Sequence, residues 1–203
     1  MTAQARTAAH PGEPVTATAR QEQDAADLTR SLRDPEHFTA IYDRHFTAVY
    51  RYVAGRLGPQ VADDLAAETF LVAFRKREAF DPRRGALRPW LFGIATNLVA
   101  QHKRDETRRY KALARAGAEP SSTAGHEDRV VRLVAAEGMQ PRLARALASL
   151  SQAERDVVLL VALSGFAHDE VAQALDIPYG TVGSRLSRAR KKLRAALDLE
   201  VLP

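Results

Sequence analysis

The sequence predicts an all-α protein made of two small helical domains joined by a flexible linker, with a helix-turn-helix in the C-terminal domain. Apolar residues recur at three- and four-residue intervals in most segments, and no alternating run is long enough for a convincing strand. The stretch "ALARAGAEPSSTAG" separates two groups of such segments and has the small residues, Gly and Pro of a linker. The boundaries that we expect are a disordered tail at 1–33, a first domain at 34–110, the linker at 111–125 and a second domain at 126–203.

The first domain is expected to be a compact bundle of helices. Apolar residues from Phe38 to Leu57 predict a helix over about 35–57, which Gly58 and Pro59 end. A second helix is expected over about 60–78 and a third over about 88–104, separated by the loop "FDPRRGAL". The residues before position 34 contain almost no large apolar side chains, which favours disorder there.

The second domain is expected to begin near His126, with a break at Gly138 and Pro141. A capping box then starts the helix "SQAERDVVLLVALSG", because Ser151 and Glu154 can each satisfy a backbone amide of its first turn. That helix is expected to pack beneath the helix-turn-helix.

The helix-turn-helix is predicted from "FAHDEVAQALDIP" and the segment after it. The first of its helices stops before Pro178, which cannot continue a helix. Asp176 stands where such turns often carry Gly, and Ile177 supplies an apolar plug between the two helices. The second helix is expected to open at Gly180 and Thr181.

The second helix, "GTVGSRLSRARKKLRAAL", has one apolar face and one basic, hydroxyl-bearing face. The apolar stripe that we expect to be buried consists of Val182, Leu186, Ala189, Leu193 and Leu197. The opposite face consists of Gly183, Ser184, Ser187, Arg188, Lys191 and Arg194. A solvated face normally mixes charge signs, whereas this one does not. The pattern therefore predicts a helix that enters the major groove of DNA.

Composition narrows the class of protein. The chain has 203 residues and a formal net charge of +5, which fits a polyanionic partner. It has no cysteine, so disulfides and thiolate metal sites are excluded. No apolar run approaches the roughly 18 residues of a membrane span, so we expect no membrane insertion and a cytoplasmic protein.

Three stretches in order resemble the sigma factors of bacterial RNA polymerase, in the extracytoplasmic-function (ECF) group of the sigma-70 family. They are "DDLAAETFLVAFRKREAF", "RPWLFGIATNLVAQHKR" and "GTVGSRLSRARKKL", and the resemblance covers about residues 35–199. It implies that the first stretch docks on the polymerase clamp, the second melts and binds the minus-10 promoter element, and the third binds the minus-35 element.

The resemblance assigns site residues to each stretch. For core polymerase binding they are Asp63, Asp64, Glu68 and Phe70. For the minus-10 element they are Trp90, Asn97, Lys103, Arg104 and Arg108, with the loop "FDPRRGAL" holding a flipped-out base. For the minus-35 element they are Thr181, Gly183, Ser184, Arg185, Ser187, Arg188 and Lys191, with Gly183 standing where many relatives carry Lys or Arg.

The same resemblance implies a role as a binding subunit without catalysis of its own. We expect no cofactor, no small-molecule substrate and no metal, since the six histidines are scattered without ligand spacing. The partners implied are core RNA polymerase, promoter DNA as duplex and as melted non-template strand, and an anti-sigma factor. Two alternatives stay open from the residues alone: a conventional helix-turn-helix regulator that acts without polymerase, and an interaction protein whose basic helix is incidental.

Overall fold

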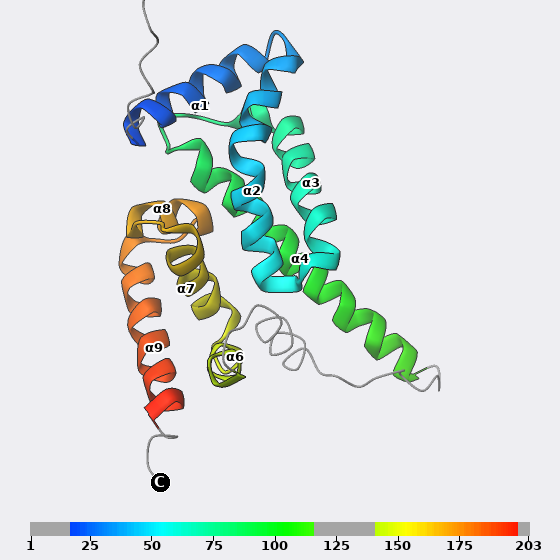
Figure 1. Ribbon diagram of the computed structural model, residues 1–203, viewed down its shortest axis with the longest axis vertical. Coiled ribbons are helices and arrows are strands. Elements are labelled where there is room, and N and C mark those ends of the chain that lie inside the picture. Colours follow the sequence, from blue (N-terminus) through cyan, green and yellow to red (C-terminus); the bar gives the residue numbers. More distant parts are fainter. Residues whose placement is uncertain (1–16, 116–140, 199–203) are drawn as a thin grey trace, which may run out of the picture.

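The computed structural model describes residues 17–115 and 141–198, and every regular element in those two ranges is a helix (Figure 1). The first domain holds α1 (Ala17–Ser31), α2 (Phe38–Leu57), α3 (Pro59–Arg75) and α4 (Leu87–Arg115), with 3-10 turns at Pro35–His37 and Arg77–Ala79. The second holds α6 (Pro141–Ala148), α7 (Gln152–Ser164), α8 (His168–Leu175) and α9 (Tyr179–Asp198). The all-helical, two-domain prediction is confirmed.

Helices α2, α3 and α4 form the core of the first domain. Gly58 adopts a φ of 95°, which L side chains rarely adopt, and Pro59 occupies the first turn of α3, so the two helices meet at a sharp corner. Ile41, Val53 and Leu91 are fully buried between the three helices. This packing holds the outer surfaces of α3 and α4 in fixed positions.

Helix α4 is longer than the sequence predicted. It runs to Arg115, so residues 111–115 belong to the helix and not to the expected linker. Ala, Leu, Lys and Arg fill its last turn, and all are strong helix formers, while the first Gly after it is Gly117. The remaining linker residues, Gly138 and the expected domain start near His126 lie outside the described residues.

Helix α1 corrects the expectation of a disordered tail, which is wrong for residues 17–31. Its buried face is held by charge pairing, because Asp24 bonds to Nε2 of His45 at 2.9 Å and to Arg44. Arg44 also donates to Asp27 at 2.8 Å, and Leu28 adds an apolar contact to the core. The sequence analysis judged this segment by its lack of large apolar residues. It therefore missed α1, which contacts α2 mainly through Asp24 and Asp27.

The second domain confirms the predicted local signals. The Ser151–Glu154 capping box is formed at the start of α7, and Asp176 takes the left-handed conformation between α8 and α9 with a φ of 50°. Val182, Leu186 and Ala189 are buried and Leu193 is half-buried. The prediction was wrong for Leu197, which is 37% exposed.

The two domains pack against each other along α2 and α4 on one side and α7 and α8 on the other (Figure 1). Their apolar residues form one continuous core, in which Val157, Leu160 and Val171 of the second domain belong to the same cluster as Leu91 and Phe92 of α4. The contact brings the helix-turn-helix directly beside α4.

We expect Asp24→Ala to lower the free energy of unfolding by about 1–3 kcal/mol, because it removes the buried carboxylate that bonds to Arg44 and His45. Urea unfolding followed by circular dichroism measures the change. Gln21→Ala, at an exposed position of the same helix, serves as the control. Equal stability of the two variants would show that α1 is not held by this carboxylate.

Candidate nucleic-acid interface

Helix α9 presents the face expected to contact the minus-35 element. Ser184, Ser187, Arg188 and Lys191 are exposed, whereas Thr181, Gly183 and Arg185 are half-buried. A Cβ added at Gly183 would meet no atom within 4 Å, so packing does not demand a glycine there. The N-terminal half of this face carries Gly183 and Ser184, and its exposed cations begin at Arg188, one turn after Ser184.

Tyr179, at the first position of α9, was not among the predicted residues. Its side chain is 63% exposed, and its ring lies 6.0 Å from that of His168 at the start of α8. A large exposed aromatic side chain at the tip of a recognition helix can contact sugar or base. The sequence analysis missed Tyr179 because it precedes the expected start of the helix at Gly180. Periodicity assigns a residue to a face only when that residue lies within the helix.

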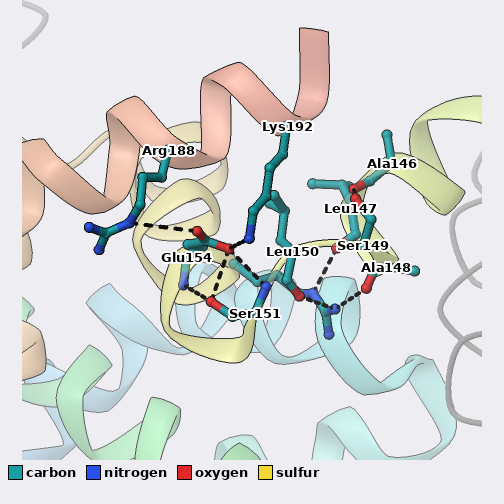
Figure 2. A network of polar contacts seen from close by, with 10 residues as sticks. Ala146, Leu147, Ala148, Ser149, Leu150, Ser151, Glu154, Arg188 and Lys192 are labelled. Atoms are coloured by element: carbon teal, nitrogen blue, oxygen red, sulfur yellow. Dashed lines mark hydrogen bonds and ion pairs between the residues drawn. The ribbon is translucent and has the colours of Figure 1, made fainter. Parts of the chain in front are cut away.

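Glu154 of α7 is the centre of a polar network behind the recognition helix (Figure 2). Its carboxylate is 5% exposed and accepts hydrogen bonds from the Ser151 N–H at 2.9 Å and from Nζ of Lys192 at 2.8 Å. These bonds, that of Lys192 first, lower the pKa of Glu154 to about 2. The group is therefore ionised throughout the physiological range, and it ties the first turn of α7 to α9.

Arg188 is oriented by the same carboxylate. Its Nε lies 3.8 Å from the Glu154 carboxylate, and Figure 2 shows its two terminal nitrogens pointing away from Glu154. The side chain is 61% exposed. Because the ion pair engages the inner edge of the guanidinium, the outer edge is left to bind a base or a phosphate.

Helix α4 carries the face expected to contact the minus-10 element. At about 100° per residue, Trp90, Asn97, Arg104 and Arg108 fall within about 40° of one another around the helix. Asn97, Arg104 and Arg108 are exposed. Trp90 is half-buried with its ring 5.2 Å from that of Phe80, so it belongs partly to the core and partly to this face.

A cavity of about 610 Å³ lies between this face and the helix-turn-helix. Trp90, Asn97 and Ile94 of α4 line one side, and Phe80, Asp81, Arg84 and Gly85 of the loop before α4 line another. Ala172, Gln173 and Ile177 of the second domain close it. The loop "FDPRRGAL" thus lies beside Trp90 and Asn97.

Lys103 does not lie on this face, contrary to the prediction. It points to a different side of α4, is 8% exposed and lies near Arg155 and Asp156 of α7. Burial, followed by repulsion from Arg56 and Arg155, lowers its pKa to about 8. Helical periodicity alone separates position 103 from the other four residues by more than a quarter turn.

The residues expected to bind core polymerase lie on α3. Asp63, Asp64 and Glu68 are exposed on α3. Phe70 is 3% exposed and packs on Tyr42 with ring centroids 5.0 Å apart, so its side chain belongs to the core. The exposed apolar side chain beside these acids is Leu71, three residues after Glu68 and therefore on its side of the helix.

No group of three His, Asp or Glu side chains in the two described ranges could hold a metal ion. Among the helices of residues 17–115 and 141–198, none combines the length and the apolar content needed to cross a bilayer.

Two family models match the chain. Residues 41–109 match Sigma-70 region 2, and residues 141–193 match Sigma-70 region 4. The first match covers α2 to α4, and the second covers α6 to most of α9.

The relatives agree with these matches. The ECF RNA polymerase sigma factor SigC of Mycobacterium tuberculosis is 33% identical over 154 residues, covering 72% of this chain and 76% of that protein. The ECF RNA polymerase sigma factor SigW of Bacillus subtilis is 30% identical over 178 residues, covering 81% of this chain and 90% of that protein. The solved structure of CnrH with the cytosolic domain of CnrY is similar with a TM-score of 0.61 and 26% identity, over 87% of this chain and 98% of that one.

Glu154→Gln is expected to lower the discrimination of α9 between DNA sequences about five- to tenfold, because an oriented Arg–base pair contributes about 1–3 kcal/mol of discrimination. The amide oxygen can still accept from Ser151 N–H, so the cap survives. Affinity for random-sequence duplex should hold or rise, since a negative charge is lost. Titration of a duplex selected by the native chain and of a random one measures both.

The control for that experiment is the Arg188→Ala background, in which Glu154→Gln should change discrimination no further. A simple loss of folding would weaken both duplexes equally. That result would contradict the orienting role of Glu154.

The depressed pKa of Lys103 predicts a pH dependence of stability. Below pH 8 the folded chain holds a charged, buried ammonium beside Arg56 and Arg155, with only Asp156 and Glu106 as opposing charges. From pH 8 to about 10.5 the folded state has already released this proton and the unfolded state has not, so stability rises. Lys103→Met removes the effect.

Urea unfolding at steps of pH compares the native chain with Lys103→Met. The variant should be more stable at pH 7, by up to roughly 3 kcal/mol at 1.36 kcal/mol per unit of pKa shift, and this advantage should shrink through the window from pH 8 to 10.5. A difference that is constant with pH would contradict a buried charged Lys103.

Proposed function

The chain belongs to the sigma-70 family and is an ECF sigma factor, a subunit with which RNA polymerase initiates transcription, and we propose how its helices divide that work. Helix α9 binds the minus-35 element as duplex. Helix α4 binds the melted non-template strand of the minus-10 element, and α3 binds core RNA polymerase.

The observation that supports this division is that two separate helices, one in each domain, expose basic faces with few acids beside them. On α9 the exposed cations include Arg188, Arg190, Lys191 and Arg194. On α4 they include Arg104, Arg108 and Arg109. Cations placed this way bind phosphates on both elements, while the few side chains beside them select bases.

The minus-10 face suits unpaired bases better than duplex. Trp90 offers a partly open ring for stacking, and the amide of Asn97, two turns further along, can pair with the edge of an unstacked base. Melting then requires no covalent step, because binding of the unpaired strand shifts the duplex toward the open state.

The polymerase face joins charge to an apolar contact. Asp63, Asp64 and Glu68 supply three carboxylates, and Leu71, 47% exposed, supplies an apolar anchor among them. A rim of charge around an apolar side chain is typical of protein interfaces. A basic, partly apolar surface of the polymerase is the complement.

We further propose that an anti-sigma factor regulates the chain. We also propose that the chain acts in the cytoplasm, where polymerase and promoter DNA meet. Two similar solved structures support the first point. One is CnrH with the cytosolic domain of CnrY, and the other is RpoE of Bartonella quintana with the anti-sigma factor NepR, which has a TM-score of 0.60 and 26% identity over 80% of this chain and 98% of that one.

Replacing Asp63, Asp64 and Glu68 together by Ala should weaken binding to core RNA polymerase between about threefold and about a hundredfold, because three carboxylates at about 0.2–1 kcal/mol each contribute about 0.6–3 kcal/mol. Co-purification with sigma-free core enzyme measures this, and transcription in vitro from a selected promoter measures function. A triple replacement of the exposed Glu22, Glu36 and Asp43 removes the same charge outside the stretch assigned to polymerase docking.

The control variant should bind polymerase as the native chain does. If the native chain ignored core polymerase yet bound duplex DNA, the conventional regulator would replace the sigma factor. If both triple variants bound equally well, α3 would not be the docking helix.

A further inference from the structure

A second cavity, of about 380 Å³, lies between the middle of α4 and the start of α7. Among the described residues that line it, four are cationic and none is acidic. Its volume is roughly a dozen times the ~30 Å³ that one molecule occupies in liquid water, so it has room for a small anion. The residues that line it are Lys103, Arg104, Thr107 and Arg108 of α4 and Gln152 and Arg155 of α7.

The α4 side of the cavity carries three cations at different depths. At about 100° per residue, positions 103, 104, 107 and 108 fall within about 140° of one another around the helix. Lys103 is the deepest of the cations at 8% exposure, whereas Arg104 and Arg108 are exposed. An anion in the cavity would therefore meet one recessed ammonium and two guanidinium groups nearer the solvent.

The α7 side adds a guanidinium held in place and the start of a helix. Arg155 donates from Nε to the Leu147 carbonyl at 2.9 Å and from Nη2 to the carbonyls of Ala148 and Leu150 at 2.8 and 2.9 Å. These three acceptors are neutral, and they fix the position of the guanidinium. Gln152 is the first residue of α7, so the positive end of that helix's dipole also lies at the cavity.

The buried ammonium of Lys103 has no hydrogen bond and no ion pair to any residue in the two described ranges. Burial, followed by repulsion from Arg56 and Arg155, lowers the pKa of Lys103 to about 8, although Asp156 and Glu106 act in the opposite direction. A buried charge without a partner is costly. An anion in the cavity would supply the counter-charge that this ammonium lacks.

The carboxylates around the cavity are already engaged with other cations. None of them therefore serves as the counter-ion of Lys103. The four pairs are Asp156 with Arg56, Glu154 with Lys192, Glu106 with His102 and Asp105 with Arg108.

We propose that the cavity between α4 and α7 binds the diphosphate group of a small molecule. Guanidinium groups pair in a bidentate manner with phosphate oxygens, and a Lys ammonium binds them as a point charge. Arg104 and Arg108 lie about 6 Å apart along the axis of α4 at 1.5 Å per residue. Two linked phosphates match this spread of positive charge better than one.

A free diphosphate fits the cavity better than the backbone of DNA does. Each phosphate of a nucleic-acid strand is flanked by sugars that must run past the site, whereas α4 and α7 bound this cavity on two sides. The cation without a partner, Lys103, is also recessed, while the cations of the proposed promoter-binding faces are exposed. The site goes beyond the proposed function and does not depend on it.

Isothermal titration calorimetry of the full chain with inorganic pyrophosphate, in a buffer free of phosphate and divalent cations, tests the proposal. We expect the native chain to bind one pyrophosphate. Gln152→Glu places a carboxylate at the cavity and should weaken this binding at least tenfold. The fold should be kept, because an acidic residue in the first turn of a helix is favoured by the helix dipole.

Gln60→Glu is the matched control, since it makes the same change at an exposed position in the first turn of α3. It should bind pyrophosphate as the native chain does. Equal weakening in the two variants, each shown by circular dichroism to be folded, would overturn the site.

Lys103→Met and Lys111→Met form a second matched pair, on α4 itself. Each removes one positive charge, but Lys103 lines the cavity and Lys111 is an exposed residue outside it. Only Lys103→Met should weaken pyrophosphate binding at least tenfold. If both variants lost affinity equally, the anion would be responding to the overall charge of the helix, and the site would be refuted.

Titrations with ADP and adenosine identify the source of the diphosphate. Tighter binding of ADP than of pyrophosphate would assign a nucleotide, and weaker binding would assign the inorganic anion; both results support the site. Adenosine has no phosphate and should not bind. Adenosine that bound as tightly as ADP would overturn the role of the diphosphate.

Two further results would also overturn the proposal. One is the absence of pyrophosphate and ADP binding by the folded native chain at millimolar concentration. The other is a Gln152→Glu variant that binds pyrophosphate normally but binds random-sequence duplex more weakly than Gln60→Glu does, which would assign the cavity to the DNA backbone. Neither result bears on polymerase binding, which the co-purification measures separately.

Discussion

The burial of Arg56 is the constraint on which the arrangement of the molecule depends. Removing a guanidinium from water is costly, and burial alone would lower its pKa, yet Tyr52 and Asp156 outweigh that effect and raise it. Tyr52 belongs to the same helix and Asp156 to the other domain, so the charge is fully compensated only when the domains are docked. The position of α8 beside α4 depends on that pairing.

A second carboxylate organises the recognition domain in a comparable way. Oε2 of Glu154 accepts hydrogen bonds from the Ser151 N–H and from Nζ of Lys192. Its other oxygen, Oε1, lies 3.8 Å from Nε of Arg188. A carboxylate at the first turn of α7 is also favoured by the helix dipole. One residue therefore stabilises the start of α7, ties α7 to α9 and leaves the outer edge of the Arg188 guanidinium exposed.

The features predicted correctly from the sequence are those that depend on neighbouring residues. The capping box at Ser151, the turn at Asp176 and the stripe from Val182 to Ala189 each depend on residues within one or two turns, and each was confirmed. Docking of α1 through Asp24 depends on partners about twenty residues away, and the Arg56–Asp156 pair joins residues one hundred apart. Helical periodicity gives no information about pairs of residues this far apart in the sequence, so these contacts could not be predicted from it.

The site residues divide in the same way. Asn97, Arg104 and Arg108, which the resemblance assigned to the minus-10 element, are exposed on one side of α4. Lys103, assigned to the same element, is buried, because its surroundings depend on α7 of the other domain. The family pattern names positions, whereas the packing of this chain decides which of them reach solvent.

Gly93 shows how the packing of the two domains shapes α4. Inside a helix, glycine costs about 1 kcal/mol relative to alanine. A Cβ at this position would lie 2.6 Å from the backbone carbonyl oxygen of Ala174, so the absence of a side chain lets α8 approach α4 closely. The lower helix propensity of Gly93 is therefore offset by the contact between the two domains.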